Sequence, residues 1–189
     1  MTFSRATATG SAHSRRINVL QGEHAVSSGD DVVLCTVLGS CIAACLYDAD
    51  AGVGGMNHFL LPDRTDGAGA DEAAMRYGAY SMEVLINDLM KRGARRDHLV
   101  AKLFGGAKMF DSLVDVGSAN AAFARRFLDD EGIPIVGASV GGRSARRIEF
   151  WPKTGRARQR EVDQQVAELK TAPARAPAPA ADTGGVELF

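Results

Sequence analysis

A cysteine and a histidine stand where they could carry out chemistry together. Cys41 directly follows Gly39-Ser40 inside an otherwise apolar, strand-like stretch, residues 36–48. A cysteine nucleophile needs a base within hydrogen-bond reach, and the base is usually a histidine. Of the four histidines in the chain, only His58 can be placed near Cys41 from the sequence. The pair therefore predicts a thiol nucleophile with an imidazole base.

The position of His58 depends on how two expected strands, 41–47 and 53–62, pair across a tight turn. In one register Cys41 lies opposite Leu60 and His58 is its diagonal neighbour. In a register with a shorter turn, Cys41 lies opposite His58. Side chains alternate along a strand, so both registers put the pair on one face, with Cβ atoms roughly 5 to 8 Å apart. A slip by one residue would separate them.

The bend before Cys41 suggests where an oxyanion would bind. Gly39 and Ser40 let the chain turn sharply, and backbone N–H groups around such a turn can point at one place. On the facing strand, Gly54 and Gly55 are expected to leave room for a bulky substrate. Asn57 is assigned to the same substrate groove, although its side chain should point to the face opposite His58.

A third group should orient the imidazole, and two neighbours are candidates. Thr36 and Cys35 both lie on the strand before the bend, and a threonine hydroxyl can accept a hydrogen bond from the ring N–H. The residue pattern leaves open which of them fills this position.

Other readings of these residues are less specific. A lone buried cysteine is usually a core residue, and Cys45 is interpreted that way. A zinc site made by the cysteines and His58 is disfavoured, because zinc sites prefer paired cysteine knuckles on loops. The arginine-rich stretch 142–160 is interpreted as the solvated face of an edge hairpin, not as a nucleic-acid surface.

The elements that must position these residues follow from hydrophobic periodicity. Continuous apolar runs predict strands, and a stripe at steps of three and four, Met75, Ala79, Met82, Ile86 and Leu89, predicts a helix closed by Gly93. Ala119, Ala122, Phe123 and Phe127 give the apolar face of a second helix. The order β-β-β-α-β-α-β-β predicts an α+β protein. We expect an α/β sandwich with a mixed, largely antiparallel sheet and helices packed on it. The six strands of this order are expected at 31–38, 41–47, 53–62, 98–104, 133–140 and 146–151, and the helices at 71–92 and 118–131. Residues 157–163 are a candidate for a further strand.

Composition sets the remaining limits. The 189 residues are 46% hydrophobic and 24% charged with a formal net charge of −1, so no global field attracts nucleic acid or an anionic membrane. No apolar run approaches the roughly 20 residues that cross a bilayer, and no secretory signal is evident. Three closely spaced cysteines suit a reducing compartment, which predicts a cytoplasmic protein. One domain is expected at 17–165, between disordered segments 1–16 and 166–189.

The motifs resemble those of the CheD family of chemoreceptor glutamine deamidases. The specific part is "TVLGSCIAACLYD" followed by "GGMNHFLLP", and "KLFGGAKMF", "VGSAN" and "GGRSARRIEFWPKTG" continue the likeness. The resemblance covers about residues 17–163. It implies that Cys41 is the nucleophile and His58 the base, and that a threonine before the bend, matched by Thr36 or in an ungapped comparison by Cys35, is the third member.

The resemblance also implies an activity and partners. The reaction would hydrolyse the side-chain amide of glutamines on chemoreceptors, Gln + H₂O → Glu + NH₃, without a metal or organic cofactor. A CheC-type phosphatase is a second partner that the resemblance implies. The alternative hypothesis is therefore a regulatory binding partner of CheC in which catalysis is secondary.

Overall fold

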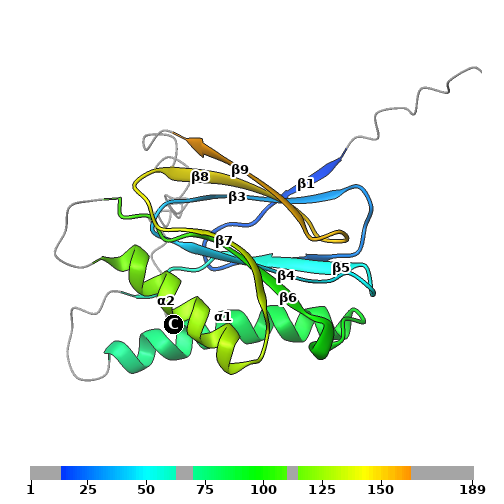
Figure 1. Ribbon diagram of the computed structural model, residues 1–189, viewed down its shortest axis with the longest axis horizontal. Coiled ribbons are helices and arrows are strands. Elements are labelled where there is room, and N and C mark those ends of the chain that lie inside the picture. The colour runs from blue at the N-terminus through cyan, green and yellow to red at the C-terminus, as the bar shows by residue number, and fades with distance from the viewer. Residues whose placement is uncertain (1–13, 63–69, 110–114, 163–189) are drawn as a thin grey trace, which may run out of the picture.

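The protein is built in three layers, two stacked β-sheets and one layer of helices (Figure 1). The computed structural model describes residues 14–62, 70–109 and 115–162, with side chains of the first helix from residue 72. A four-stranded sheet has the order β1-β3-β8-β9, and a five-stranded sheet has the order β2-β5-β4-β6-β7. The strands are β1 (Arg15–Asn18), β2 (His24–Ser27), β3 (Val32–Leu38), β4 (Ile42–Asp48), β5 (Val53–Asn57), β6 (Val100–Gly105), β7 (Ile135–Val140), β8 (Ala145–Trp151) and β9 (Arg156–Val162).

The fold class agrees with the predicted α+β sandwich. Five strand pairs are antiparallel, and two pairs, β1 with β3 and β6 with β7, are parallel. The structure differs from the expectation in having two sheets where one was predicted. Residues 39–41 lie between β3 in one sheet and β4 in the other, so the predicted bend is the place where the chain crosses between the layers.

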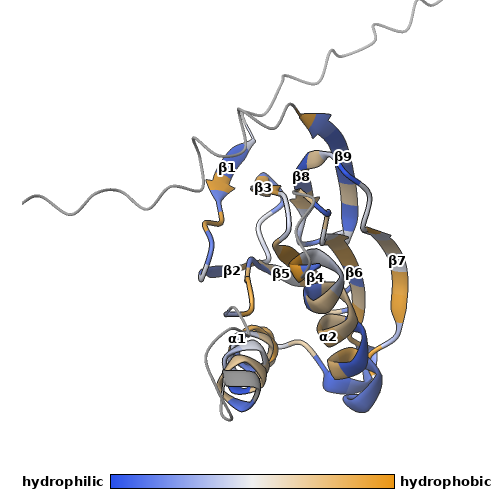
Figure 2. Ribbon diagram, turned by 90° about the vertical axis from the view of Figure 1, so that its left-hand side faces the viewer, coloured by the Kyte–Doolittle hydropathy of each residue, from blue (hydrophilic) through white to orange (hydrophobic). Residues whose placement is uncertain are grey.

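Both α-helices lie on the outer face of the five-stranded sheet (Figures 1 and 2). Helix α1 (Ala70–Lys91) packs on β5, β2 and β4, and α2 (Val116–Asp130) packs on β4, β6 and β7. Arg96–His98 forms one turn of 3₁₀ helix, η1, before β6. Met82, Ile86 and Leu89 are buried as the stripe of α1 predicts, with Met75 and Ala79 packed beside them.

The apolar face of α2 is displaced from the predicted one. Ala122 is exposed, whereas Asn120, Ala124 and Leu128 are buried together with Phe123. Alanine tolerates either environment, so it could not fix the orientation of the helix, and a buried asparagine breaks the pattern on which the prediction relied. The position of Asn120 matters for the site described below.

Two cores hold the layers together. The first lies between the five-stranded sheet and the helices. The second lies between the sheets and contains Leu34, Leu38, Ile148 and Phe150 from one sheet. From the other sheet come Cys41, Ala43, Cys45, Met56 and Phe104. The inner faces of both sheets thus supply the environment of Cys41.

The expected domain bounds, 17–165, stay a prediction, because the residues beyond 162 lie outside the described part of the chain. β1 begins at Arg15, two residues before the predicted start of the domain, and β9 ends at Val162. The segments predicted to be disordered fall mostly on 1–13 and 163–189, which lie outside the described residues. Neither described helix is long and apolar enough to pass through a bilayer.

Candidate active site

The β4–β5 hairpin puts Cys41 and His58 on one face, as predicted. Ile42 pairs with Phe59, and each residue donates its N–H to the carbonyl of the other at 2.9 Å. Cys41 therefore lies opposite Leu60 and His58 is its diagonal neighbour, which is the first of the two predicted registers. Both side chains lie in the space between the sheets, with 5% of Cys41 and 2% of His58 exposed.

The hydrogen bonds around His58 assign its tautomer. The Thr36 hydroxyl lies 2.8 Å from the Val19 carbonyl oxygen, to which it donates. Its lone pairs then accept from His58 Nδ1 at 2.9 Å, and Nδ1 also lies 3.3 Å from the Val19 oxygen. Because both neighbours of Nδ1 act as acceptors, the proton belongs on Nδ1. Nε2 is left as a proton acceptor, and it is buried without a hydrogen-bond partner among the described residues.

Of the two candidates for the third position, Thr36 contacts the imidazole. Cys35 is the next residue along β3, so its side chain points to the other face of the four-stranded sheet. There its thiol lies 3.8 Å from the Val33 carbonyl oxygen. The sequence could not separate the two because neighbouring strand residues differ only in the face that they occupy.

In the resting state the thiol and the imidazole are both neutral. Burial raises the pKa of Cys41 from its ordinary value of 9.0 to about 11, against a smaller lowering by its own backbone N–H. Burial lowers the pKa of His58 more than the Val19 carbonyl and the charge of Glu23 raise it. The imidazole does not lower the thiol pKa in this arrangement, because the thiol donates to Gln21 Oε1 at 3.4 Å and makes no hydrogen bond to His58 among the described residues.

The bend before Cys41 is fixed by the two glycines at the end of β6, Gly105 in the strand and Gly106 directly after it. Ala107 N–H donates to the Gly39 carbonyl at 2.9 Å, and Gly106 N–H donates to the Cys41 carbonyl at 2.7 Å. Gly105 and Gly106 have φ values of 110° and 64°. A Cβ atom on Gly105 would overlap the Cys41 carbonyl oxygen. Two left-handed glycines are therefore needed for this close approach.

The bend leaves backbone donors free near the thiol. In the described part of the chain, neither Ser40 N–H nor Cys41 N–H donates to a backbone carbonyl. The Cys41 N–H instead stabilises its own sulfur when that is ionised. Binding of an oxyanion by these amides stays a prediction.

Asn120 is a positioning residue that the sequence analysis missed. It is fully buried on α2, where Oδ1 accepts from Leu61 N–H at 2.8 Å and Nδ2 donates to the Ser40 carbonyl at 3.0 Å. One side chain thus ties the bend before Cys41 to the strand that carries His58. A polar residue on an otherwise apolar helix face, four residues before Ala124, was the signal that could have indicated it.

Three residues assigned to a substrate groove do not line one, so that prediction is wrong. A Cβ on Gly54 would overlap the Pro152 carbonyl, and one on Gly55 would lie 2.7 Å from Leu85 Cδ1. These glycines make room for the protein's own hairpin and helix. Asn57 is fully buried, accepts from Ala44 N–H at 2.9 Å and donates to the Ser81 carbonyl at 3.1 Å. It points away from His58, as expected, and joins the sheet to α1.

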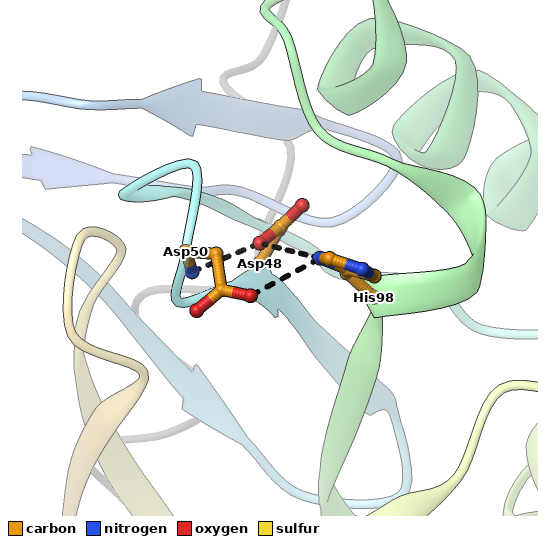
Figure 3. A group of neighbouring side chains, drawn as sticks. All are labelled: Asp48, Asp50 and His98. Carbon is orange, nitrogen blue, oxygen red and sulfur yellow. Dashed lines mark hydrogen bonds and ion pairs between the residues drawn. The ribbon is translucent and has the colours of Figure 1, made fainter.

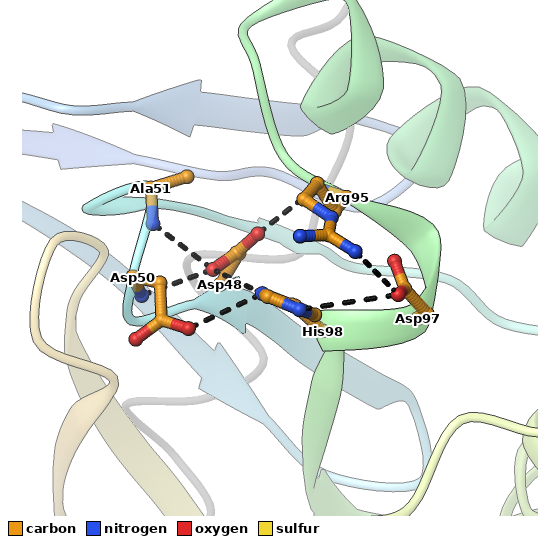
Figure 4. A network of polar contacts seen from close by, with 6 residues as sticks. All are labelled: Asp48, Asp50, Ala51, Arg95, Asp97 and His98. Carbon is orange, nitrogen blue, oxygen red and sulfur yellow. Dashed lines mark hydrogen bonds and ion pairs between the residues drawn. The ribbon is translucent and has the colours of Figure 1, made fainter.

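A second polar cluster lies at the far end of β4, about 24 Å of strand from Cys41 at roughly 3.4 Å per residue. Asp48, Asp50 and His98 come together there (Figure 3). The buried Asp48 carboxylate accepts from the backbone N–H groups of Asp50, Ala51 and Arg95 at 3.0, 3.0 and 2.9 Å (Figure 4). Burial acts to raise the pKa of Asp48, but these hydrogen bonds outweigh it and the pKa is lowered. Asp48 therefore ties a turn to the start of η1.

The arginine-rich hairpin is not one uniform solvated face. Arg146 is buried and donates to the Ser139 carbonyl at 2.7 Å. Arg158 Nε donates to Glu149 Oε2 at 2.7 Å, and Glu149 also forms an ion pair with Arg16. Arg156 stacks over Trp151, 3.9 Å from the ring centroid. Several of the charges are thus used within the protein.

Comparison with known proteins places the chain in a family. The CheD model, described as CheD chemotactic sensory transduction, matches residues 60–161. A protein of Caulobacter vibrioides named probable chemoreceptor glutamine deamidase CheD is 61% identical over 92% of this chain and 93% of its own length. A Caulobacter sp. protein of the same name is 59% identical over 99% of this chain and 100% of its own. Among solved structures, the hypothetical protein YfiH of Bacillus licheniformis has a TM-score of 0.40 and 12% identity, covering 68% of this chain and 60% of that one. The match over nearly the full length of these relatives shows that the chain belongs to the CheD family.

Proposed function

We propose that the chain is a protein-glutamine deamidase that acts on chemoreceptors, with Cys41 as nucleophile, His58 as base and Thr36 as the residue that orients the base. The observation that carries this proposal is the state of His58. Its Nδ1 proton is held by Thr36 and Val19. Its Nε2 is buried, has no hydrogen-bond partner among the described residues and lies one diagonal step from Cys41 on the same sheet face. An imidazole needed only for packing would be expected to have both ring nitrogens paired.

The resting protonation states indicate a general-base mechanism. The thiol is neutral below a pKa of about 11, so it must lose its proton to His58 Nε2 as it attacks the amide carbon. A rotation of the Cys41 side chain from Gln21 toward Nε2 makes this transfer possible. The backbone N–H groups of Ser40 and Cys41 would hold the oxyanion.

The second half of the reaction uses the same groups in reverse. The imidazolium of His58 gives its proton to the departing nitrogen, so that ammonia leaves and a thioester on Cys41 remains. The neutral imidazole then takes a proton from water as the water oxygen attacks the thioester carbon. The C–S bond breaks, His58 returns the proton to the Cys41 sulfur, and a glutamate side chain is left on the receptor. Thr36 accepts from Nδ1 throughout, which keeps the ring in the same orientation. His58 thus accepts and donates each proton that is transferred in the two halves of the reaction.

The names of the relatives supply the substrate class. They describe glutamines of chemoreceptors, and each conversion replaces a neutral amide with a carboxylate. Binding of a CheC-type phosphatase, with catalysis secondary, stays a prediction, because no contact in the structure favours it over the hydrolytic role.

Mass spectrometry of a receptor fragment tests the proposal. Wild-type protein should add about 1 Da for each glutamine converted from amide to acid and should release one ammonia for each such change. Cys41→Ala should abolish both. Cys45→Ala is the matched control, because it removes a second thiol that is buried in the same core and makes no hydrogen bond to His58 or Thr36 among the described residues. Ammonia from Cys41→Ala at the wild-type rate would refute the thiol mechanism.

A further inference from the structure

The hydrogen-bond partner of the Cys41 thiol is a side-chain carboxamide of the same chain. Gln21 Oε1 accepts from Cys41 Sγ at 3.4 Å. Gln21 itself is exposed, while only 5% of Cys41 is exposed. A carboxamide on a glutamine is also the group that the proposed reaction hydrolyses. The chain thus presents its own copy of the substrate group to its own nucleophile.

The backbone that carries Gln21 is held firmly in place. Residues 20–23 form a turn in which Glu23 N–H donates to the Leu20 carbonyl at 3.0 Å, and Gly22 has a φ of 84°. These values describe a type II turn, which needs glycine at its third position. Gly22 N–H donates to the His58 carbonyl at 2.7 Å, and His58 N–H donates to the Glu23 carbonyl at 3.0 Å. The turn is therefore built onto the residue that supplies the base.

The side chain of Gln21, in contrast, can leave without moving the turn. The hydrogen bond to Cys41 is the single contact that the structure gives its carboxamide among the described residues. Rotamer changes of exposed side chains take picoseconds to nanoseconds, so its departure does not need a loop to open. The thiol can then turn to His58 Nε2, to which no described residue is hydrogen-bonded while Gln21 is in place.

We propose that Gln21 is an intramolecular occupant of the substrate carboxamide site, which a substrate glutamine displaces before Cys41 can react. This inference rests on the proposed deamidase function. The orientation of Gln21 fits an occupant that does not react, because its oxygen accepts the thiol proton and its carbon is not the atom presented to sulfur. While it is bound, the proton stays on the sulfur and away from the base.

An in-cis competitor has a defined kinetic effect. Substrate binds only the fraction of molecules in which Gln21 is displaced, and the apparent dissociation constant rises by the inverse of that fraction. A neutral hydrogen bond of ordinary strength makes this fraction roughly one in three to one in ten. Removal of the carboxamide should therefore raise kcat/KM by about three- to tenfold and leave kcat unchanged.

The test compares Gln21→Ala and Gln21→Glu with Gln159→Ala, which removes an exposed glutamine from β9. The first measurement is the alkylation rate of Cys41 by iodoacetamide without receptor, with the labelled cysteine located by fragment-ion mass spectrometry. The second is kcat and KM on a receptor fragment. Gln21→Ala should speed both alkylation and kcat/KM by the factor above. Gln21→Glu should slow both, because a carboxylate still accepts from the thiol and repels the thiolate.

Opposite effects of the two Gln21 variants would separate an occupant from a structural residue, whose loss would impair both. A fall in kcat for Gln21→Ala would overturn the proposal and make Gln21 a part of the catalytic machinery. No change in either measurement would also overturn it. If alkylation speeds up in Gln21→Ala but wild-type protein releases no ammonia, the deamidase function fails and the covering of Cys41 by Gln21 stands.

Discussion

Replacing Thr36 with valine tests whether its hydroxyl sets the tautomer of His58. Valine has nearly the shape of threonine, so the inter-sheet core should stay filled while two hydrogen bonds, to Val19 and from His58, are lost. His58 Nδ1 keeps a weaker acceptor, because the Val19 oxygen lies 3.3 Å away. The ring is therefore loosened but not left without a partner.

The expected size of the effect follows from that remaining contact. Loss of one net hydrogen bond that favours the reactive tautomer is worth about 1 kcal/mol, which corresponds to a fall in kcat of roughly fivefold. The free energy of unfolding should fall by about 1 to 2 kcal/mol, since both hydrogen bonds of the hydroxyl are lost. Loss of the base itself in His58→Ala should be far more severe.

Ammonia release at saturating receptor fragment gives kcat, and urea unfolding gives the stability. Thr36→Ser is the rescue variant, because it restores the hydroxyl and lacks only the methyl group. It should recover most of the lost kcat. A kcat for Thr36→Val within twofold of wild type, or a kcat for Thr36→Ser as low as that of the valine variant, would refute the orienting role.

Three further predictions concern the surroundings of the site. Asn120→Ala leaves the Ser40 carbonyl and the Leu61 N–H unpaired, so urea unfolding should report a loss of about 2 to 4 kcal/mol. Gly105→Ala should lower both activity and melting temperature, because its Cβ meets the Cys41 carbonyl, whereas Gly132→Ala, also at positive φ but with open space around it, should lower stability by about 1 kcal/mol and keep activity. Ammonia release should fall as pH drops through the lowered pKa of His58, and alkylation of Cys41 should stay slow up to pH 9 because its pKa is about 11. His58 binds a proton near pH 6.5 in the unfolded chain, whereas its pKa is lower in the folded protein. The stability that depends on neutral His58 is therefore fully present above pH 6.5 and is lost as pH falls from 6.5 through the lower, folded-state pKa.

The site could be predicted from sequence where it depends on local pattern. The face shared by Cys41 and His58 follows from strand alternation and one tight turn, and the structure adopts one of the two registers considered. Thr36 and Cys35 could not be separated, because their difference lies in which face of β3 meets the second sheet. That question depends on the packing of two layers, and the sequence pattern indicated only one.

The errors have the same origin. Gly54 and Gly55 were interpreted as space for a substrate, but the sequence does not say whose atoms fill the space beside a glycine. Gln21 and Asn120 reach the site from segments 20 and 79 positions away from Cys41, and the local sequence does not say which residues either side chain contacts. Long-range hydrogen bonds of single side chains are the part that periodicity cannot supply.

The crossing of the chain between the two sheets has a consequence for variation far from the thiol. Thr36 belongs to one layer, and Cys41 and His58 belong to the other, so the contact at 2.9 Å between threonine and imidazole spans the gap between them. The length of that hydrogen bond depends on the distance between the two sheets. An enlarged side chain anywhere in the shared interior, such as at Ala43 or Cys45, would push the layers apart and stretch it. The enzyme would then still fold but have a lower kcat. Its catalytic rate should therefore respond to changes in the packing of the core between the sheets.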